Sequence, residues 1–436
     1  MTHIWNSALL RSCTVCMFIV LTAPSVLADD WPQWRGPNRD GVWHETGIVE
    51  SFSKTQLDIK WRAEVSNGYS GPTVAKGRVY LTDRVIDPGQ MERVLAFDEA
   101  TGEALWTHAY ACRYQRVGYP DGPRASVTIA DGRAYALGTM GHFRCLDAET
   151  GELLWKKDPG TDYDIAQSIW GITSAPLVDG DLVIVQLGAR PDACIVALDR
   201  RTGQEVWRAL EDKPSYSAPV IIEQAGRRVL LCWTGEHIVG LDPATGAVHW
   251  QYDTPAQKMI INVPTPVTDG NRLFLSSFYD GSYMLRLRQD VLGVQKIWRR
   301  IGENERHTDA LHAMISTPLI QGDYVYGVDS YGQLRCLDAN NGNRIWEDLT
   351  AVPSERWATI HMVRNGDRIW MFNDQGELII STLSPEGFNE ISRTKLIDTT
   401  KGQLNRGVTW SHPAFANKHI FIRSDTELLC ANLAAE

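Results

Sequence analysis

The sequence predicts an all-β protein, an eight-bladed β-propeller built from four-stranded blades. The first observation is a repeated figure, clearest from Leu146 to Trp155, in which an Asp stands eight residues before a Trp. The second is that the Trp residues at the ends of successive units, from Trp61 to Trp346, recur at intervals of 43 to 52 residues, which suits four short strands per unit. The third is that short segments rich in β-branched and aromatic residues alternate with Gly turns, as strands do.

The figure occurs five times with the same inner spacing. Its Asp and Trp members are Asp98 and Trp106, Asp147 and Trp155, Asp199 and Trp207, Asp242 and Trp250, and Asp338 and Trp346. An Asp side chain caps its own turn, and the Gly of the intervening Thr-Gly or Asn-Gly supplies the positive φ of a tight connection. A Trp buries a large flat face while its indole N–H finds a carbonyl. We therefore expect these residues to join neighbouring blades and to perform no chemistry.

Eight units follow one another along the chain, although two of them are degenerate. The fifth unit ends at Trp298 without the Leu-Asp and Thr-Gly signals, and the seventh, around Trp370, lacks a closing Trp. The eighth unit runs out of chain before its outermost strand, whereas the segment 59–65 is a strand without a unit. Pairing these two would close the ring and remove exposed strand edges. The expected count is eight blades, or seven if the seventh unit is not a full blade.

The first 28 residues are typical of a secretory signal peptide. Arg11 precedes an apolar run at residues 13–21, and small residues lead to an expected cleavage near Ala28. The run is shorter than the roughly 18 apolar residues of a membrane span. We therefore expect a periplasmic or otherwise extracytoplasmic protein with no stable membrane span.

Two further parts follow the signal. Residues 29–58 are predicted to form an extended Trp-rich arm, because Pro, Gly and Asn deny this stretch a regular element. Its residues Trp31, Trp34 and Trp43 should pack onto the body rather than remain in water. Residues 59–436 are predicted to form the single propeller domain, and we expect a monomer.

Charge and cysteine content exclude several classes of function. The formal net charge is −10, which argues against a surface that follows nucleic-acid phosphates. Six cysteines follow the predicted signal, and no pair has the CxxC spacing of a zinc or redox site. We expect most of them to be buried as small hydrophobic residues.

The Leu-Asp-x-x-Thr-Gly-x-x-x-Trp figure resembles the tryptophan-docking repeat of pyrroloquinoline-quinone (PQQ) propellers, and the resemblance covers residues 31–433. That family includes quinoprotein alcohol dehydrogenases, which bind PQQ and calcium on the ring axis. It also includes non-catalytic BamB-type proteins of outer-membrane barrel assembly and secreted members of unknown role. The opening from Trp31 to Pro37 looks like that of the secreted members.

The chain departs from the dehydrogenases of this family. Those enzymes carry two adjacent cysteines over the cofactor, and no Cys-Cys occurs here. Their calcium-binding Glu and Asn and their catalytic Asp match no motif of this sequence. The resemblance therefore favours the BamB-type or uncharacterised branch, although the sequence has no lipoprotein cysteine. PQQ with calcium stays a possible cofactor, and no other cofactor or metal is implied.

The candidate ligand-binding residues lie in the loops that enter the innermost strands. In a propeller these loops meet around the axis at one mouth. The candidates are Tyr69, Tyr119, Arg124, Trp170, Tyr216, Asn262, His312, Trp357, His361, Trp410 and His412. Aromatic rings, imidazoles and an Arg around one cavity could bind a flat, anionic or sugar-like ligand. Alternatively, these residues plug the channel and satisfy one another's hydrogen bonds. No spacing supports a metal site among the three imidazoles.

These observations leave three hypotheses of function. The first is a secreted, non-catalytic propeller that binds a protein partner or serves as a scaffold. The second is a PQQ-dependent oxidoreductase of alcohols or sugars, and the third is a carbohydrate-binding propeller. No catalytic residue can be assigned, because the Gly-x-Ser-x-Gly, His-Glu-x-x-His and phosphate-loop motifs are all absent.

Overall fold

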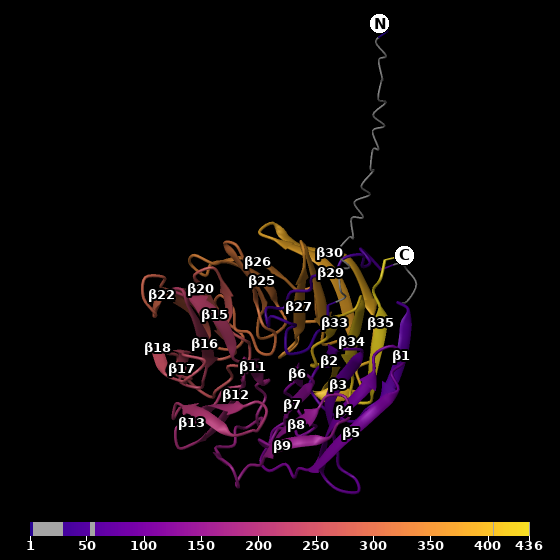
Figure 1. The fold of residues 1–436 in the computed structure, drawn as a ribbon. Helices are drawn as coiled ribbons and strands as arrows, with labels where there is room; N and C mark the ends of the chain where they lie inside the picture. The colour runs from indigo at the N-terminus through magenta and orange to yellow at the C-terminus, as the bar shows by residue number, and fades with distance from the viewer. Residues whose placement is uncertain (3–28, 53–56, 404, 436) are drawn as a thin grey trace.

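A computed structural model describes residues 1–2, 29–52, 57–403 and 405–435. Eight four-stranded antiparallel sheets stand around one axis as the blades of a propeller, which confirms the predicted fold (Figure 1). Short strands lie nearest the axis, and each blade ends in a strand at the rim. Within the described ranges there is no helix, and hence none long and apolar enough to cross a membrane. The predicted cleavage point at Ala28 lies outside the described residues.

The first four blades pair their strands in chain order. Blade 1 contains β2 (Thr73–Ala75), β3 (Arg78–Val85), β4 (Met91–Asp98) and β5 (Ala104–Ala111). Blade 2 contains β6 (Thr128–Ala130), β7 (Arg133–Leu137), β8 (Phe143–Asp147) and β9 (Leu153–Lys157). Blade 3 contains β11 (Leu177–Asp179), β12 (Leu182–Arg190), β13 (Ala193–Asp199) and β14 (Glu205–Ala209), with β10 (Asp164–Ile165) added beside β12. Blade 4 contains β15 (Val220–Gln224), β16 (Arg227–Trp233), β17 (His237–Leu241) and β18 (Val248–Asp253).

The next three blades repeat this order. Blade 5 contains β19 (Val267–Asp269), β20 (Arg272–Ser277), β21 (Gly281–Leu287) and β22 (Val294–Arg300). Blade 6 contains β23 (Leu319–Gln321), β24 (Tyr324–Val328), β25 (Leu334–Asp338) and β26 (Arg344–Asp348). Blade 7 contains β27 (Ile360–Asn365), β28 (Arg368–Asn373), β29 (Glu377–Ser384) and β30 (Gly387–Lys395), and a small hairpin of β31 (Lys401–Gln403) and β32 (Arg406–Val408) follows it.

The eighth blade joins the two ends of the propeller. It contains β33 (Ala414–Ala416), β34 (His419–Arg423), β35 (Glu427–Asn432) and, as its outermost strand, β1 (Ile59–Glu64). In this blade Trp61 pairs with Cys430, and Ala63 pairs with Leu428, in antiparallel register. The N-terminal strand therefore closes the ring, as the sequence predicts.

Blade 7 is complete, so the alternative count of seven blades does not apply. The register of β29 and β30 places Ser392 opposite Ile380, where blade 2 places Trp155 opposite Cys145. The Ser392 hydroxyl accepts a hydrogen bond from the backbone N–H of Phe52 at 3.0 Å. Phe52, a residue of the N-terminal arm, thus covers the position from which the repeat's Trp is missing.

The repeated figure joins each blade to the next one. In Asp147 the Oδ1 atom accepts the backbone N–H groups of Glu149 and Thr150, both at 2.9 Å. The ring of Trp106 from blade 1 lies over Gly151 of this turn, and its indole N–H donates to the carbonyl of Ala148 at 3.2 Å. The other copies repeat this arrangement, which confirms that the motif is structural. Its tryptophans dock across the blade boundary, where burial of their faces stabilises the ring.

Two docking Trp residues meet blades that lack the figure. The indole N–H of Trp346 donates to the carbonyl of Ser384 in blade 7 at 2.8 Å, and for Trp250 a glutamine makes the connection to blade 5. The indole N–H of Trp250 donates to Gln224 Oε1 at 2.9 Å within its own blade. The Gln224 amide in turn donates to the carbonyls of Arg288 and Gly293 in blade 5, at 3.2 and 2.6 Å. Blade 5 is therefore held without a Thr-Gly turn.

Gly151→Ala should lower the free energy of unfolding more than Gly132→Ala does. Both glycines have a φ of +75°, so both substitutions carry the left-handed strain of an L residue, about 1–2 kcal/mol. A Cβ on Gly151 would lie 2.6 Å from the Trp106 ring, whereas one on Gly132 has no neighbour within 4 Å. We expect Gly151→Ala to cost about 1–3 kcal/mol beyond its control in denaturant unfolding. Equal losses for the two variants would contradict tight docking.

The N-terminal arm is part of the core. Trp31 and Trp43 are 2% and 1% exposed, so both pack onto the body as predicted. Trp31 exchanges two backbone hydrogen bonds with Val74 of β2, and the Trp43 N–H donates to the carbonyl of Arg364 in β27. The arm thus spans the interior of the ring from blade 1 to blade 7.

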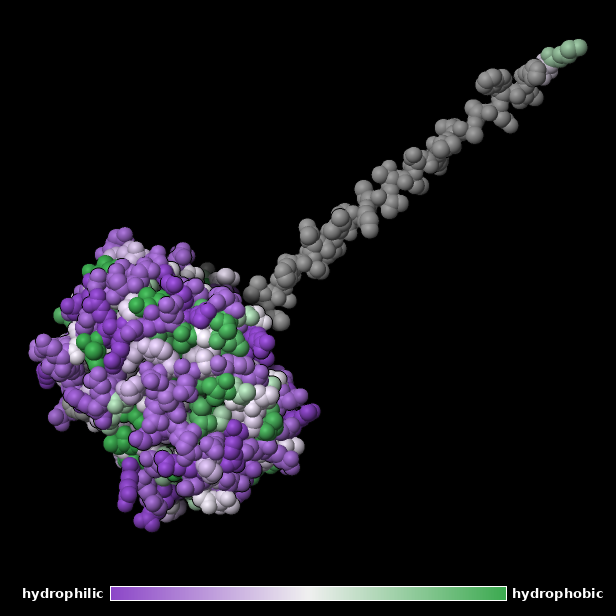
Figure 2. Space-filling view, turned by 90° about the vertical axis from the view of Figure 1, so that its left-hand side faces the viewer, coloured by the Kyte–Doolittle hydropathy of each residue, from purple (hydrophilic) through white to green (hydrophobic). Residues whose placement is uncertain are grey.

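The face shown in Figure 2 is mainly hydrophilic, and apolar groups interrupt it at separate places. Exposed apolar side chains recur on the outermost strands of successive blades, among them Leu105, Leu154, Val206, Val248 and Ile345. Because such residues occur singly at the surface of most soluble proteins, they mark no particular site. The six cysteines of the described ranges are all buried and form no disulfide with one another, as expected for small hydrophobic residues.

Candidate functional site

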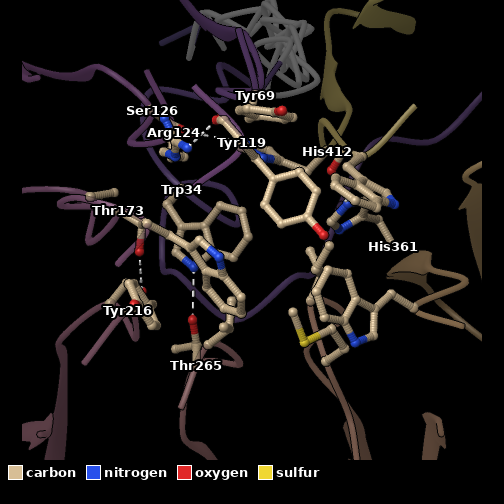
Figure 3. Close-up of a pocket in the computed structure, with 18 residues that line it drawn as sticks. Trp34, Tyr69, Tyr119, Arg124, Ser126, Thr173, Tyr216, Thr265, His361 and His412 are labelled. Atoms are coloured by element: carbon tan, nitrogen blue, oxygen red, sulfur yellow. Dashed lines mark hydrogen bonds between the residues drawn. The ribbon is translucent and has the colours of Figure 1, made fainter. Parts of the chain in front are cut away.

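A cavity of about 150 Å³ lies on the ring axis, where loops from all eight blades meet (Figure 3). Most of its lining residues stand directly before an innermost strand. They are Trp34, Tyr69, Tyr119, Arg124, Ser126, Trp170, Thr173, Ala175, Tyr216, Ala218, Val263, Thr265, Met314, Ile315, Trp357, His361, Trp410 and His412. We call this space the axial cavity.

The N-terminal arm supplies one wall of the axial cavity. The indole N–H of Trp34 donates to Thr265 Oγ1 of blade 5 at 2.8 Å (Figure 3). The Trp34 ring meets the edge of His412, with 4.4 Å between the ring centroids. Among the described residues of the arm only Trp34 belongs to the lining, so this wall is a single indole.

Arg39 anchors the same arm to blades 3 and 4. Its guanidinium donates to the carbonyls of Pro176 and, at 3.0 Å, Pro219, and its Nε–H donates to Gln33 Oε1 at 2.8 Å. The side chain is fully enclosed, and burial lowers its pKa to about 9. A cation held by carbonyl oxygens in this way fixes the arm beneath the cavity.

Four aromatic rings from different blades cluster in the lining of the cavity. The centroid of Tyr119 lies 5.7 Å from those of Trp357 and Trp410 and 6.5 Å from that of Trp170. All three contacts are edge-to-face, the arrangement that aromatic quadrupoles favour. Tyr119, Trp170 and Trp410 remain partly exposed, so the cavity reaches solvent between these rings.

Two of these aromatic residues have a strained backbone. Tyr119 and Trp357 have φ values of 53° and 63°, in the left-handed region that bulky residues rarely adopt. Such conformations cost about 1–3 kcal/mol each and persist where the surroundings determine them. Here they bring the two rings together across the axis.

Arg124 is the one cationic side chain in the cavity lining, and its hydrogen-bond donors are committed. Its guanidinium donates to the carbonyls of Gly118 and Tyr119, at 3.0 and 2.5 Å, and to that of Gly122. It also lies 5.0 Å from the centre of the Tyr69 ring. Burial is the main cause that lowers the pKa of Arg124. Its role in this geometry is to hold the loop of Tyr119.

Two imidazoles meet in the cavity wall. The centroids of His361 and His412 are 5.9 Å apart. The Nε2–H of His361 donates to the carbonyl of Trp410 at 2.9 Å, and Nε2 of His412 lies 2.9 Å from the hydroxyl of Ser126. Burial lowers the pKa of His361 to about 4 and that of His412 well below its ordinary value. Both rings are therefore neutral at physiological pH.

The structure brings together most of the residues that the sequence proposes for the mouth. All of them line the axial cavity except Asn262 and His312. The Asn262 amide donates to the carbonyl of Thr234 at 2.8 Å. His312 Nδ1 lies 3.0 Å from the carbonyl of Phe278, and its Nε2 accepts the N–H of Gly302 at 3.0 Å. These two side chains therefore form hydrogen bonds with loop backbone groups and do not belong to the cavity lining.

Other lining residues were missed in the sequence. Trp34 belongs to the arm, and its partner Thr265 lies 231 residues further along the chain. Ser126, Thr173 and Met314 are in the entry loops, but a hydroxyl or thioether carries no motif there. Their one available signal was closeness to a candidate residue, since each lies two or three positions after Arg124, Trp170 or His312.

The axial residues do not fit PQQ with calcium. The cofactor is a fused three-ring tricarboxylate, whereas a cavity of about 150 Å³ holds one benzene-sized ring. The single cation in the lining, Arg124, already serves backbone carbonyls. Across the described residues no three His, Cys, Asp or Glu side chains group as ligands for a metal ion.

Comparison with known proteins gives relatives of two kinds. BamB, the outer membrane protein assembly factor of Burkholderia pseudomallei, is 25% identical over 267 residues, which cover 56% of this chain and 64% of that protein. The quinohemoprotein alcohol dehydrogenase ADH-IIG of Pseudomonas putida is 26% identical over 226 residues, covering 46% and 30%. The alignments thus span less than two thirds of the length of either relative.

A solved structure with the same fold is BamB from Moraxella catarrhalis. It superposes with a TM-score of 0.59 at 17% identity, over 86% of this chain and 99% of that one. The family model described as outer membrane protein assembly factor BamB matches residues 90–348, more than half of the chain. The chain therefore belongs to the BamB-type family of PQQ-repeat propellers.

Proposed function

We propose that this protein is an extracytoplasmic, non-catalytic propeller that binds protein partners as a scaffold. Residues 1–28 would be removed as a signal peptide near Ala28, leaving the arm of residues 29–58 and the propeller of residues 59–436. The assembly-factor relatives support a role in protein binding, since their name describes the assembly of other proteins.

The observation that carries this proposal is the filled axis. A quinoprotein needs its axial channel for the cofactor, but here the arm enters that space and Trp34 forms a wall of what remains. The aromatic cluster around Tyr119 also takes up space in the lining. Such an interior supports a binding protein rather than an oxidoreductase.

The alternatives draw less support from the geometry. The dehydrogenase relatives favour a quinone enzyme by sequence, but the cavity does not fit PQQ. A sugar site needs free donors and acceptors. The hydroxyls of Thr173 and Thr265 are already bonded to the Tyr216 carbonyl and the Trp34 indole. Carbohydrate binding therefore stays a hypothesis without a carrying observation.

Photo-crosslinking in cells tests the proposal. A photoreactive phenylalanine analogue would replace Ile169, which is 49% exposed beside the cavity, or Leu154, which is 42% exposed at the rim. We expect a discrete adduct with one extracytoplasmic protein, identified by mass spectrometry and reproduced by co-purification of the unmodified pair.

A cofactor assay tests the alternative function, a PQQ-dependent oxidoreductase. Purified protein would be incubated with PQQ and calcium and assayed for dye-linked oxidation of alcohols and sugars. Turnover that disappears in Trp170→Ala and persists in the rim control Trp346→Ala would overturn the scaffold function. We expect no turnover above the level without protein.

A further inference from the structure

We propose that the axial cavity receives one aromatic side chain, Phe or Tyr, from a partner polypeptide. This inference rests on the proposed function and names the chemistry by which the scaffold recognises its partner.

The size of the cavity selects a single ring. Its volume of about 150 Å³ matches the space that holds one benzene molecule in a protein interior. The walls include the flat aromatic side chains of Trp34, Tyr119 and Trp170. Ala175 and Ala218 also belong to the lining, and they leave room in the cavity because neither side chain extends beyond Cβ. A planar six-membered ring would make edge or face contacts with several walls at once.

The polar groups of the lining select an apolar ring over a sugar. Arg124 is used by backbone carbonyls, and the His361 N–H is used by the carbonyl of Trp410. His412 and Ser126 bond to each other. A sugar hydroxyl placed against these four side chains would have to break one of these bonds, and burying it unpaired would cost about 1–3 kcal/mol. An aromatic ring makes no such demand.

The indole N–H groups of two wall residues are unpaired. The indole N–H groups of Trp357 and Trp410 are buried and have no acceptor among the described residues. Trp357 is 6% exposed, so water cannot readily serve its N–H. Because both N–H groups are enclosed, neither is exposed to a ligand in the cavity.

The surroundings of the opening favour a polypeptide as the source of the ring. The apolar cluster that contains Trp357 continues through the partly exposed Met259 and Tyr279. Ile169, next to Trp170, is 49% exposed. A free single-ring molecule would fill the cavity and leave these side chains in water. A peptide that inserts one aromatic side chain would cover them with its neighbouring residues.

Calorimetric titration of the whole mature chain tests the inference. The probes are p-cresol, glucose, the peptide acetyl-Gly-Ser-Phe-Ser-Gly-amide and the same peptide with Leu in place of Phe. We expect p-cresol to bind one to one with a Kd of about 1 mM or below, and glucose not to bind. The Phe peptide should bind at least about fivefold more tightly than the Leu peptide, because a flat ring fits where a branched chain does not.

A cavity-filling variant locates the site. Ala218→Leu adds three carbon atoms to the lining, so the affinity for p-cresol and for the Phe peptide should fall at least about tenfold. Ala100→Leu makes the same change at an exposed turn of blade 1 and should leave both affinities unaltered. Thermal unfolding of both variants verifies that they are folded.

The outcomes separate this inference from the proposed function. If neither p-cresol nor the Phe peptide binds, or if Ala218→Leu has no effect, the cavity is not a ring receptor, although a crosslinked partner would still support the scaffold. If p-cresol binds while the Phe and Leu peptides bind equally, a free small molecule is the ligand, and the inference is overturned. Selective binding of the Phe peptide supports it even where the partner remains to be captured.

Discussion

Trp43→Ala is expected to lower the free energy of unfolding by about 3–5 kcal/mol, the usual loss for a large buried aromatic side chain. Trp43 is 1% exposed, and its ring lies 5.4 Å from Trp370 and 5.1 Å from Phe415. Its indole N–H donates to Glu45 Oε2 at 2.8 Å, and that oxygen also accepts the N–H of Lys418. The substitution would open a void between blades 7 and 8 and remove one donor from a buried carboxylate.

Chemical denaturation monitored by circular dichroism measures this loss. Trp43→Phe keeps most of the ring and should recover more than half of it. Ile86→Ala, at a side chain that is 58% exposed, should change stability by less than about 0.5 kcal/mol. If Trp43→Ala behaved like Ile86→Ala, the arm would be a loose tail rather than part of the core.

Acidification should destabilise the protein through the two axial histidines. Burial lowers the pKa of His361 to about 4, and the nearby Arg35 cation acts in the same direction. The unfolded chain, with a histidine pKa of about 6.5, then binds more protons than the folded one between pH 6.5 and 4. Stability is complete above pH 6.5 and falls as the pH decreases through this window. For His361 alone the loss is about 2 kcal/mol at pH 5 and about 3 kcal/mol below pH 4.

The pH profile of His361→Gln isolates this contribution. A glutamine can donate to the carbonyl of Trp410 but does not titrate, so the difference in unfolding free energy between pH 7.5 and 5 should shrink by about 2 kcal/mol. His307→Gln, at an exposed loop, should keep the profile of the unaltered protein. Parallel profiles for all three proteins would show that His361 takes up no proton on unfolding.

The rim of the propeller could be predicted because the residues that determine each turn are close together in the sequence. Asp147 caps a turn that begins at its own position, and Gly151 lies only four residues further. The partner of each turn is the same element one copy earlier in the chain, so the repeat also predicts the contact. Blade 7 was the exception. Ser392 stands there in place of the Trp, and the sequence does not indicate that Phe52 of the arm lies beside it.

The axial site could be predicted only in outline. Topology brings the entry loops together, and that sufficed for Tyr69, Tyr119 and most of the others. Whether a side chain enters the cavity depends on the backbone acceptors near it. Asn262 and His312 bond to the carbonyls of Thr234 and Phe278 instead, and neither lines the cavity. The contribution of Trp34 depends on where the arm runs, which no local pattern encodes.

The pairing of β1 with β35 has a consequence for how the chain is made. Residues 59–64 leave the ribosome long before residues 427–432, so the first strand of the ring waits for the last one. Contacts of such sequence separation slow folding, because a long loop must close before they form. Meanwhile β1 and the tryptophans of the arm expose apolar surface that invites aggregation. We therefore expect ring closure to limit the yield of folded protein during biogenesis, and a chaperone to act on the N-terminal third of the nascent chain.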